Sequence, residues 1–263
     1  LDYESLIVNN PRLIVAEISG YGPDDSRPAF DAIIQAETGF TYLNGPARKG
    51  QEKMPVALMD ILAAHQLKEG VLLALIRRGS TGKGGRVAVD LLSSGLASLA
   101  NQATNYLTAG VAPQPMGSAH PNIAPYGEAY ETATGPVVLA VGNDKQSEML
   151  CSLLEWEAPK FLAKNIGRVQ NRENLNRELR SRMQPWERDG LLTELARRGV
   201  PAGPINSISE AMDLPNAQEL LLQADGRGGL RSFVARMGES PVPLRPPPHL
   251  NEHHDTIMMQ YLV

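Results

Sequence analysis

The 263-residue sequence contains a single cysteine, Cys151, and no long hydrophobic run. One cysteine excludes an intrachain disulfide and suits a reducing compartment, so we expect a cytoplasmic protein. No apolar stretch approaches the ~18 residues that a membrane-spanning helix needs. Cys151 lies in an apolar helical pattern, which favours packing in the core over a role as nucleophile.

Long blocks of like charge are also absent. The formal net charge is −4, from 25 basic and 29 acidic residues that are interspersed along the chain. This distribution gives no reason to expect nucleic acid or a membrane surface as a partner.

Common nucleotide-binding, serine-nucleophile and zinc motifs are missing. In STGKGG (80–85) a glycine follows Lys83, so the Walker spacing is not met and a helix-to-strand turn is the better interpretation. No G-x-G-x-x-G follows a strand, and no G-x-S-x-G is present. The tail histidines His249, His253 and His254 lack the helical H-E-x-x-H frame, so we expect no metal.

The patterns that are present alternate between strands and helices. Apolar runs predict strands in the segments 11–22, 55–59 and 86–92, and periodicity predicts helices over 30–40, 61–79 and 93–110. The second half adds a strand and a helix within 134–154, then two charged helices over 171–183 and 185–199. This alternation predicts an α/β fold with an open, largely parallel, Rossmann-like sheet.

The sequence also predicts where two helices begin or end and how far one helix is buried. Gly79 follows two arginines and is expected to end the helix of 61–79. Ser93 or Ser94 is expected to cap the next helix. The segment 70–76, GVLLALI, is apolar all round, which indicates a helix covered on most sides.

Residues 111–125 interrupt the alternation with four prolines and no helical period. We expect a large α/β domain over 1–112, a smaller α+β domain over 113–205, and a segment over 206–263 that returns to the large domain. Within these parts, 200–208 is expected to be a linker and the proline-rich tail to be extended. The chain begins at Leu1 inside a helical pattern, so we expect it to be a piece of a longer protein.

One carboxylate interrupts an otherwise apolar stretch. In KMPVALMDILAAHQ (53–66), Asp60 lies between the predicted strand and the predicted helix. An isolated buried carboxylate is costly, so Asp60 must be capped, paired or used. Aspartate is a favoured N-cap, and active sites lie at the carboxyl ends of strands in α/β sheets, so both roles stay open. His120, in a glycine- and proline-rich loop, and His65 are weaker candidates.

The order of several motifs resembles one family. ISGYGPDDSRPAFDAIIQAETGF, PVALMD, RRGSTGKGGRVAVDLL, GSAHPNIAPY, VGNDKQ, GVPAGPIN and PPPHLNEHH follow one another as in the class III CoA-transferases, the CaiB/BaiF or formyl-CoA transferase type. LLSS, NYL and MGSAHPNIAPY look most like the succinyl-CoA–glutarate CoA-transferase branch. The resemblance extends over essentially the whole chain.

The resemblance assigns roles to residues. The family's nucleophilic aspartate falls on Asp60, and the CoA-contacting aromatic of its R-P-G-Y-D motif falls on Phe30, which keeps stacking but lacks the hydroxyl. Gln35, on the same helix, is assigned with Phe30 to CoA binding. The loop that covers the active site in relatives matches Gly117 to His120. The tail motif G-E-H-T appears as NEHH, with Asn251 in place of glycine.

The implied reaction moves CoA from an acyl-CoA to a carboxylic acid, dicarboxylic by branch, through an aspartyl-CoA thioester on Asp60. Related α-methylacyl-CoA racemases carry a catalytic histidine at the position of Phe30, and a phenyl ring cannot move a proton. Transfer is therefore favoured, with a racemase-like epimerase or a non-catalytic CoA-binding protein as alternatives. The resemblance also implies coenzyme A as part of the substrate, an intertwined homodimer, and relatives with a further N-terminal region.

Overall fold

The computed structural model describes residues 2–224, 226–235, 238 and 247–261. Contacts divide the chain into two units, Leu1–Pro204 and Ile205–Val263, and each is described by itself. The expected division into three parts, at residues 112 and 205, stays a prediction.

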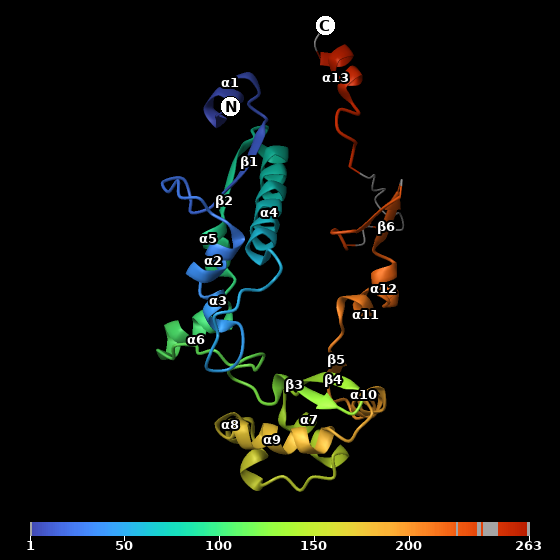
Figure 1. The fold of residues 1–263 in the computed structure, drawn as a ribbon. Coiled ribbons are helices and arrows are strands. Elements are labelled where there is room, and N and C mark those ends of the chain that lie inside the picture. The colour runs from blue at the N-terminus through green and yellow to red at the C-terminus, as the bar shows by residue number, and fades with distance from the viewer. Residues whose placement is uncertain (1, 225, 236–237, 239–246, 262–263) are drawn as a thin grey trace. The chain divides into compact units, whose positions relative to one another are not determined.

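A small parallel sheet organises the first part of the larger unit. β1 (Ile14–Ser19) pairs with β2 (Gly85–Asp90) in parallel, from Ile14 opposite Gly85 to Ser19 opposite Asp90. Parallel strands need a crossover connection, and helices supply it here. The helices of this part are α1 (Tyr3–Asn9), α2 (Asp31–Glu37), α3 (Phe40–Leu43), α4 (Leu58–Thr81), α5 (Leu91–Ala97) and α6 (Asn101–Ala109) (Figure 1). This arrangement confirms a mixed α/β fold with parallel pairing.

Helix α4 is longer than predicted at both ends. The prediction of a strand over 55–59 is wrong, because residues 53–57, all of them described, form no strand and α4 begins at Leu58. Pro55 has no N–H to give to a sheet, which weakens a strand here. The expected stop at Gly79 is also wrong: the helix continues to Thr81, and Gly82 ends it in the left-handed conformation with φ 71°.

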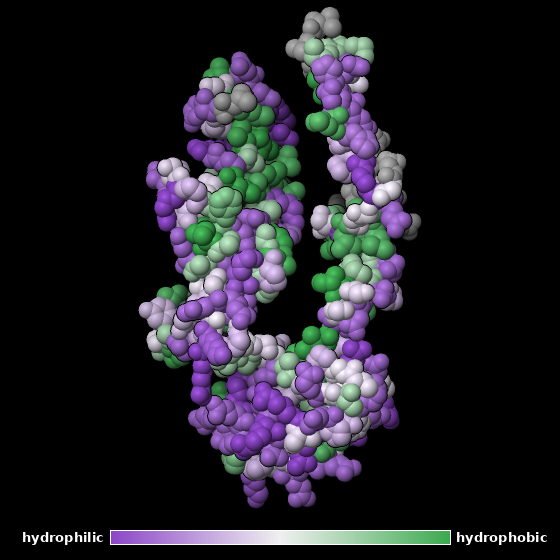
Figure 2. All heavy atoms as spheres, in the orientation of Figure 1, coloured by the Kyte–Doolittle hydropathy of each residue, from purple (hydrophilic) through white to green (hydrophobic). Residues whose placement is uncertain are grey.

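The apolar side chains of α4 are not covered on most sides, contrary to the prediction. Leu73 and Ile76 are 67% and 72% exposed. Figure 2 shows hydrophobic residues gathered over α4. The helix packs on the sheet at Gly70, where an added Cβ would lie 2.5 Å from a Val87 methyl group.

The predicted helix over 93–110 is two helices. Asp90, at the end of β2, is the N-cap of α5 and accepts a hydrogen bond from the Ser93 amide (2.6 Å). The prediction of a serine cap is therefore wrong, and Ser94 instead donates its hydroxyl to the Asp90 carbonyl (2.7 Å). Ala100, with φ 48°, separates α5 from α6.

The core of this first part is small and lies around the start of α4. Its buried residues are Ile34, Met59, Ala63 and Leu91. Gly95 of α5 fits closely against this core, since a Cβ there would lie 2.8 Å from the Met59 sulfur. The residue that precedes Asp60 is therefore fixed by packing.

The second part of the larger unit has an antiparallel sheet and its own core. The strand order is β3–β4–β5, and the core includes Tyr130, Leu139, Leu150, Leu179 and Leu195. The elements are β3 (Tyr126–Thr132), β4 (Gly135–Ala140), α7 (Asp144–Leu153), η1 (Lys160–Leu162), α8 (Asn165–Gln170), α9 (Arg172–Met183), α10 (Arg188–Arg197) and β5 (Ala202–Pro204).

The strand and helix predicted within 134–154 are confirmed as β4 and α7, and Asn143 caps α7 by accepting from the Gln146 amide. The helix predicted over 171–183 is confirmed as α9. The expected linker of 200–208 is in part a strand, because β5 pairs with β4.

The smaller unit contains short elements. Its elements are α11 (Ile208–Met212), α12 (Pro215–Gln218), β6 (Leu221–Ala224), β7 (Arg227–Leu230) and α13 (His254–Tyr261). A capping box of Ser207 and Glu210 begins α11. The prediction of an extended tail falls partly on residues outside the described ones. Asn251, which stands where the family motif has glycine, has φ 65°, a conformation that asparagine adopts more readily than most residues.

Candidate active site

Asp60 lies in the first turn of α4, as the third residue of the helix. It is not the N-cap that the sequence left open, because Ala57 occupies that place without a side-chain cap. The Asp60 side chain is exposed, and no donor among the described residues hydrogen-bonds to its carboxylate. The helix dipole favours a negative charge at this end. The carboxylate is thus exposed to solvent at the N-terminal end of α4.

The capping role belongs to another carboxylate, Asp31, the first residue of α2. Its Oδ1 accepts a hydrogen bond from the Met59 amide (2.8 Å), one of the N–H groups that the start of α4 leaves without a helical partner. The sequence placed Asp31 near a helix start but gave no sign that it reaches α4, 28 residues further on. Asp31 is therefore a residue of the site that sequence reasoning missed.

The hydrogen bond between Asp31 and Met59 brings two predicted site residues into one neighbourhood. Phe30 immediately precedes Asp31, and Asp60 immediately follows Met59. The Phe30 side chain is 71% exposed. The two exposed side chains therefore belong to residues that each lie next to a member of the Asp31–Met59 hydrogen bond.

Gln35, predicted to contact CoA, is fully buried. Its amide nitrogen donates to Asp31 Oδ2 (2.7 Å), and its amide oxygen accepts from the Met54 amide (2.8 Å). These bonds leave no exposed surface of Gln35 for a ligand in this structure. The residue holds the segment that leads into α4 instead.

Gly117 and His120 lie in the loop before β3. Gly117 has φ 65°, in the left-handed region that favours glycine. The His120 amide donates to the Tyr126 carbonyl (2.8 Å), and its ring meets the Tyr126 ring edge to face. Within the described residues, no hydrogen bond or ion pair joins this loop to Asp60. Its role as a substrate loop stays a prediction.

An ion pair anchors the end of this loop. Arg172 of α9 pairs with Glu128 of β3, and both side chains are largely buried. The other guanidinium nitrogen of Arg172 donates to the carbonyls of His120 (2.6 Å) and Ile123 (3.1 Å). The Tyr126 amide donates to Glu128 (2.6 Å). The sequence gave no signal for this pair, because its members lie far apart along the chain.

A cavity of about 1030 Å³ lies beside Gly117. Four basic residues and two acidic residues line it, namely Arg48, Lys49, Arg172 and Arg180, and Glu128 and Glu173. The excess of basic groups favours an anionic ligand.

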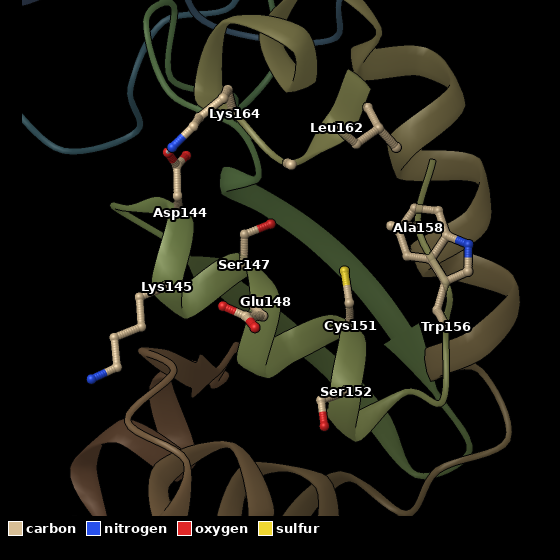
Figure 3. A pocket seen from close by; sticks show the side chains of 11 residues that line it. Asp144, Lys145, Ser147, Glu148, Cys151, Ser152, Trp156, Ala158, Leu162 and Lys164 are labelled. Atoms are coloured by element: carbon tan, nitrogen blue, oxygen red, sulfur yellow. The ribbon is translucent and has the colours of Figure 1, made fainter. Parts of the chain in front are cut away.

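A second cavity, of about 640 Å³, lies between α7 and η1 (Figure 3). Cys151 and Ser147 line it from α7, and the Asp144–Lys164 ion pair (3.2 Å) borders it. Cys151 is half-buried. Its neighbour in sequence, Leu150, belongs to the buried core of this part of the chain. Burial raises the pKa of the Cys151 thiol, which opposes a nucleophilic role.

Comparisons with known proteins place the chain in a family. The model of CoA-transferase family III matches residues 1–254. The chain belongs to CoA-transferase family III.

Two relatives of this family III chain are named as glutarate CoA-transferases. The succinate–glutarate CoA-transferase of Agrobacterium fabrum is 36% identical over 274 residues, which cover 99% of this chain and 68% of the relative. The succinyl-CoA:glutarate CoA-transferase of Mus musculus is 30% identical, over 100% of this chain and 63% of the relative. The chain thus spans about two thirds of these relatives' length.

Solved structures agree with the family assignment. A crystal structure of a CaiB/BaiF family protein from Brucella suis is 38% identical and superposes with a TM-score of 0.84. The match covers 99% of this family III chain and 71% of that protein.

The described residues of the family III chain contain no group of three or more His, Cys, Asp and Glu side chains that could hold a metal ion. None of the helices in the described part is both long and apolar enough to cross a bilayer.

Proposed function

We propose that this family III chain transfers CoA from an acyl-CoA donor to a carboxylic acid, through an aspartyl-CoA thioester on Asp60. The observation that carries the proposal is the exposed carboxylate of Asp60 in the first turn of α4, which has no hydrogen-bond or ion-pair partner among the described residues. The preceding residue, Met59, is fully buried and bonded through its amide to Asp31. Asp60 is therefore held by its main chain, while its side chain is available to a substrate.

The transfer proceeds by covalent catalysis. The Asp60 carboxylate attacks the thioester carbonyl, the C–S bond breaks, and CoA thiolate leaves an aspartyl–acyl anhydride. The thiolate then attacks the aspartyl carbonyl carbon, and the bond between that carbon and the bridging anhydride oxygen breaks. This step releases the donor acid and forms the aspartyl-CoA thioester. The acceptor carboxylate repeats these steps in reverse and regenerates the Asp60 carboxylate.

The division of roles between two carboxylates suits this chemistry. Asp31 accepts the hydrogen bond from the Met59 N–H group at the start of α4. The Asp60 carboxylate is therefore not needed as the cap of this N–H group. The oxyanions that form in each step need N–H donors, and the loop around Gly117 is our candidate for them. Phe30 is our candidate for stacking on the CoA part of the substrate.

The acids exchanged are proposed to be dicarboxylic. The names of the two glutarate-using relatives support this choice, and so does the basic cavity beside Gly117, which fits a distal carboxylate. We further propose a cytoplasmic, intertwined homodimer as the working form. A dimer of this kind would make activity depend on protomer concentration.

The test uses the intact gene product, supplied with succinyl-CoA and glutarate. CoA transfer should be lost in Asp60→Ala and kept in Asp213→Ala, a matched control at an exposed aspartate of the smaller unit. Transfer that survives Asp60→Ala would contradict the proposed nucleophile. Deuterium uptake at the substrate α-carbon in the absence of an acceptor acid would instead indicate the racemase-like alternative, which Phe30 disfavours.

A further inference from the structure

We propose that Gln35 is a positioning residue for Asp60, acting through Asp31 and through the 54–59 segment that leads into α4. The proposal rests on the proposed role of Asp60 as nucleophile. The Gln35 side chain has no solvent-accessible surface in this structure. Its proposed action is on the main chain that leads to Asp60, and its predicted contact with CoA stays a prediction.

The side-chain amide of Gln35 donates a hydrogen bond to one partner and accepts a hydrogen bond from another. Its nitrogen donates to Asp31 Oδ2 (2.7 Å), and its oxygen accepts from the Met54 amide (2.8 Å). The nitrogen also lies 3.3 Å from the carbonyl oxygens of Met54 and Val56. One side chain of α2 therefore ties down the main chain of the segment that leads to Asp60.

Gln35 also fixes how the Asp31 carboxylate is turned. Because Oδ2 is held by Gln35, Oδ1 faces the Met59 amide and accepts from it at 2.8 Å. Met59 is the residue before Asp60. Since no described donor holds the Asp60 carboxylate, a displacement of the Met59 main chain moves that carboxylate directly. Small displacements of a reacting group have large effects on rate.

With aspartate at position 31, the side chain at position 35 must both donate and accept. The Met54 amide needs an acceptor and Asp31 Oδ2 needs a donor, and the side-chain amide of Gln35 presents both. In Gln35→Glu two carboxylates would face each other, and no rotation of the new side chain supplies the missing donor. In the double variant Asp31→Asn with Gln35→Glu, the new side-chain amide at position 31 would donate to the new carboxylate instead. That exchange keeps the bonds to Met54 and Met59 but loses the two longer contacts.

The experiment measures kcat and KM of the intact gene product with succinyl-CoA and glutarate. Gln35→Glu should lower kcat by about 10- to 100-fold and leave KM for the acyl-CoA unchanged. The double variant should recover part of that loss. Gln146→Glu is the matched control: its Oε1 accepts from the Gly142 amide (2.8 Å), a bond that glutamate keeps, so kcat should equal that of the unmodified protein.

Two kinetic outcomes would overturn the positioning role: an unchanged kcat in Gln35→Glu, or a double variant no faster than Gln35→Glu. Hydrogen exchange of the 54–60 segment is measured on the same samples and does not depend on catalysis. It should be faster in Gln35→Glu and slower again in the double variant, and unchanged exchange would also refute the proposal. A gene product inactive with every acid pair would refute the proposed function separately, because the exchange data stand without activity.

Discussion

The buried guanidinium of Arg168 gives a prediction that can be worked from the structure. Arg168 of α8 has no exposed surface. Its Nε donates to the Ala124 carbonyl (2.8 Å), and its Nη1 donates to the carbonyls of Leu162 and Ala163 (both 3.1 Å). Its Nη2 donates to Asp144 Oδ1 (2.9 Å). One side chain thus joins the loop before β3 to η1 and to the start of α7.

Arg168→Met would keep much of the volume and remove all four hydrogen bonds. We expect a loss of about 3–5 kcal/mol, mainly because three main-chain carbonyls are left without this donor, at about 1–3 kcal/mol for each unsatisfied buried group. Asp144 contributes less, since its side chain is 37% exposed and keeps its pair with Lys164. For a chain of this size such a loss lowers the melting temperature by about 6–20 °C. The change in the free energy of unfolding is measured by equilibrium urea unfolding of the whole chain.

The control is Arg177→Met, whose guanidinium bonds the exposed Asn174 side chain (2.8 Å). An exposed contact of that kind is expected to change stability by at most about 0.5 kcal/mol. If Arg168→Met cost no more than Arg177→Met, the network around Arg168 would not stabilise the fold and the reasoning would be refuted.

Two further predictions concern packing and pH. Gly95→Ala should destabilise the fold by about 1–3 kcal/mol, because the new methyl group would lie 2.8 Å from the Met59 sulfur, and thermal unfolding measures the change. The hydrogen bond from Arg168 is the main cause that lowers the pKa of Asp144 below 3.8. A depressed folded-state pKa stabilises the fold above the unfolded value, and this contribution is lost as the pH falls through the folded value. The loss of stability below pH 3.8, followed by unfolding at several pH values, should therefore be smaller in Asp144→Asn than in the unmodified protein; an identical pH dependence in that variant would contradict the assignment.

Regular local patterns predicted much of the fold. The apolar β-branched run around β1 and the Asn143 cap before α7 each depend on residues close in sequence, and both are present as expected. Local pattern also predicted a boundary near Asp60, although it assigned the wrong element to the five residues before it. The prediction of a helix end from a single glycine was less reliable, since Gly79 stays helical and Gly82 ends the helix.

The site could be predicted only in part, because its contacts are long-range. The role of Asp60 as nucleophile stays a prediction. The carboxylate that caps α4 comes from Asp31, and a local pattern cannot show a bond between α2 and α4. The CoA contact of Gln35 also stays a prediction, and the sequence gave no sign that tertiary packing buries this side chain. The Arg172–Glu128 pair likewise joins α9 to β3. Each of these outcomes depends on which helices pack together.

The most direct test of Asp60 as nucleophile is mass spectrometry of the intact gene product after incubation with succinyl-CoA alone. We expect a CoA adduct on the peptide that contains Asp60, absent in Asp60→Asn and discharged by glutarate. The variant should fold as stably as the unmodified protein, to within about 0.5 kcal/mol, because the side chain is exposed and has no described partner. Turnover without any adduct at Asp60, or an adduct on another residue, would contradict the central claim.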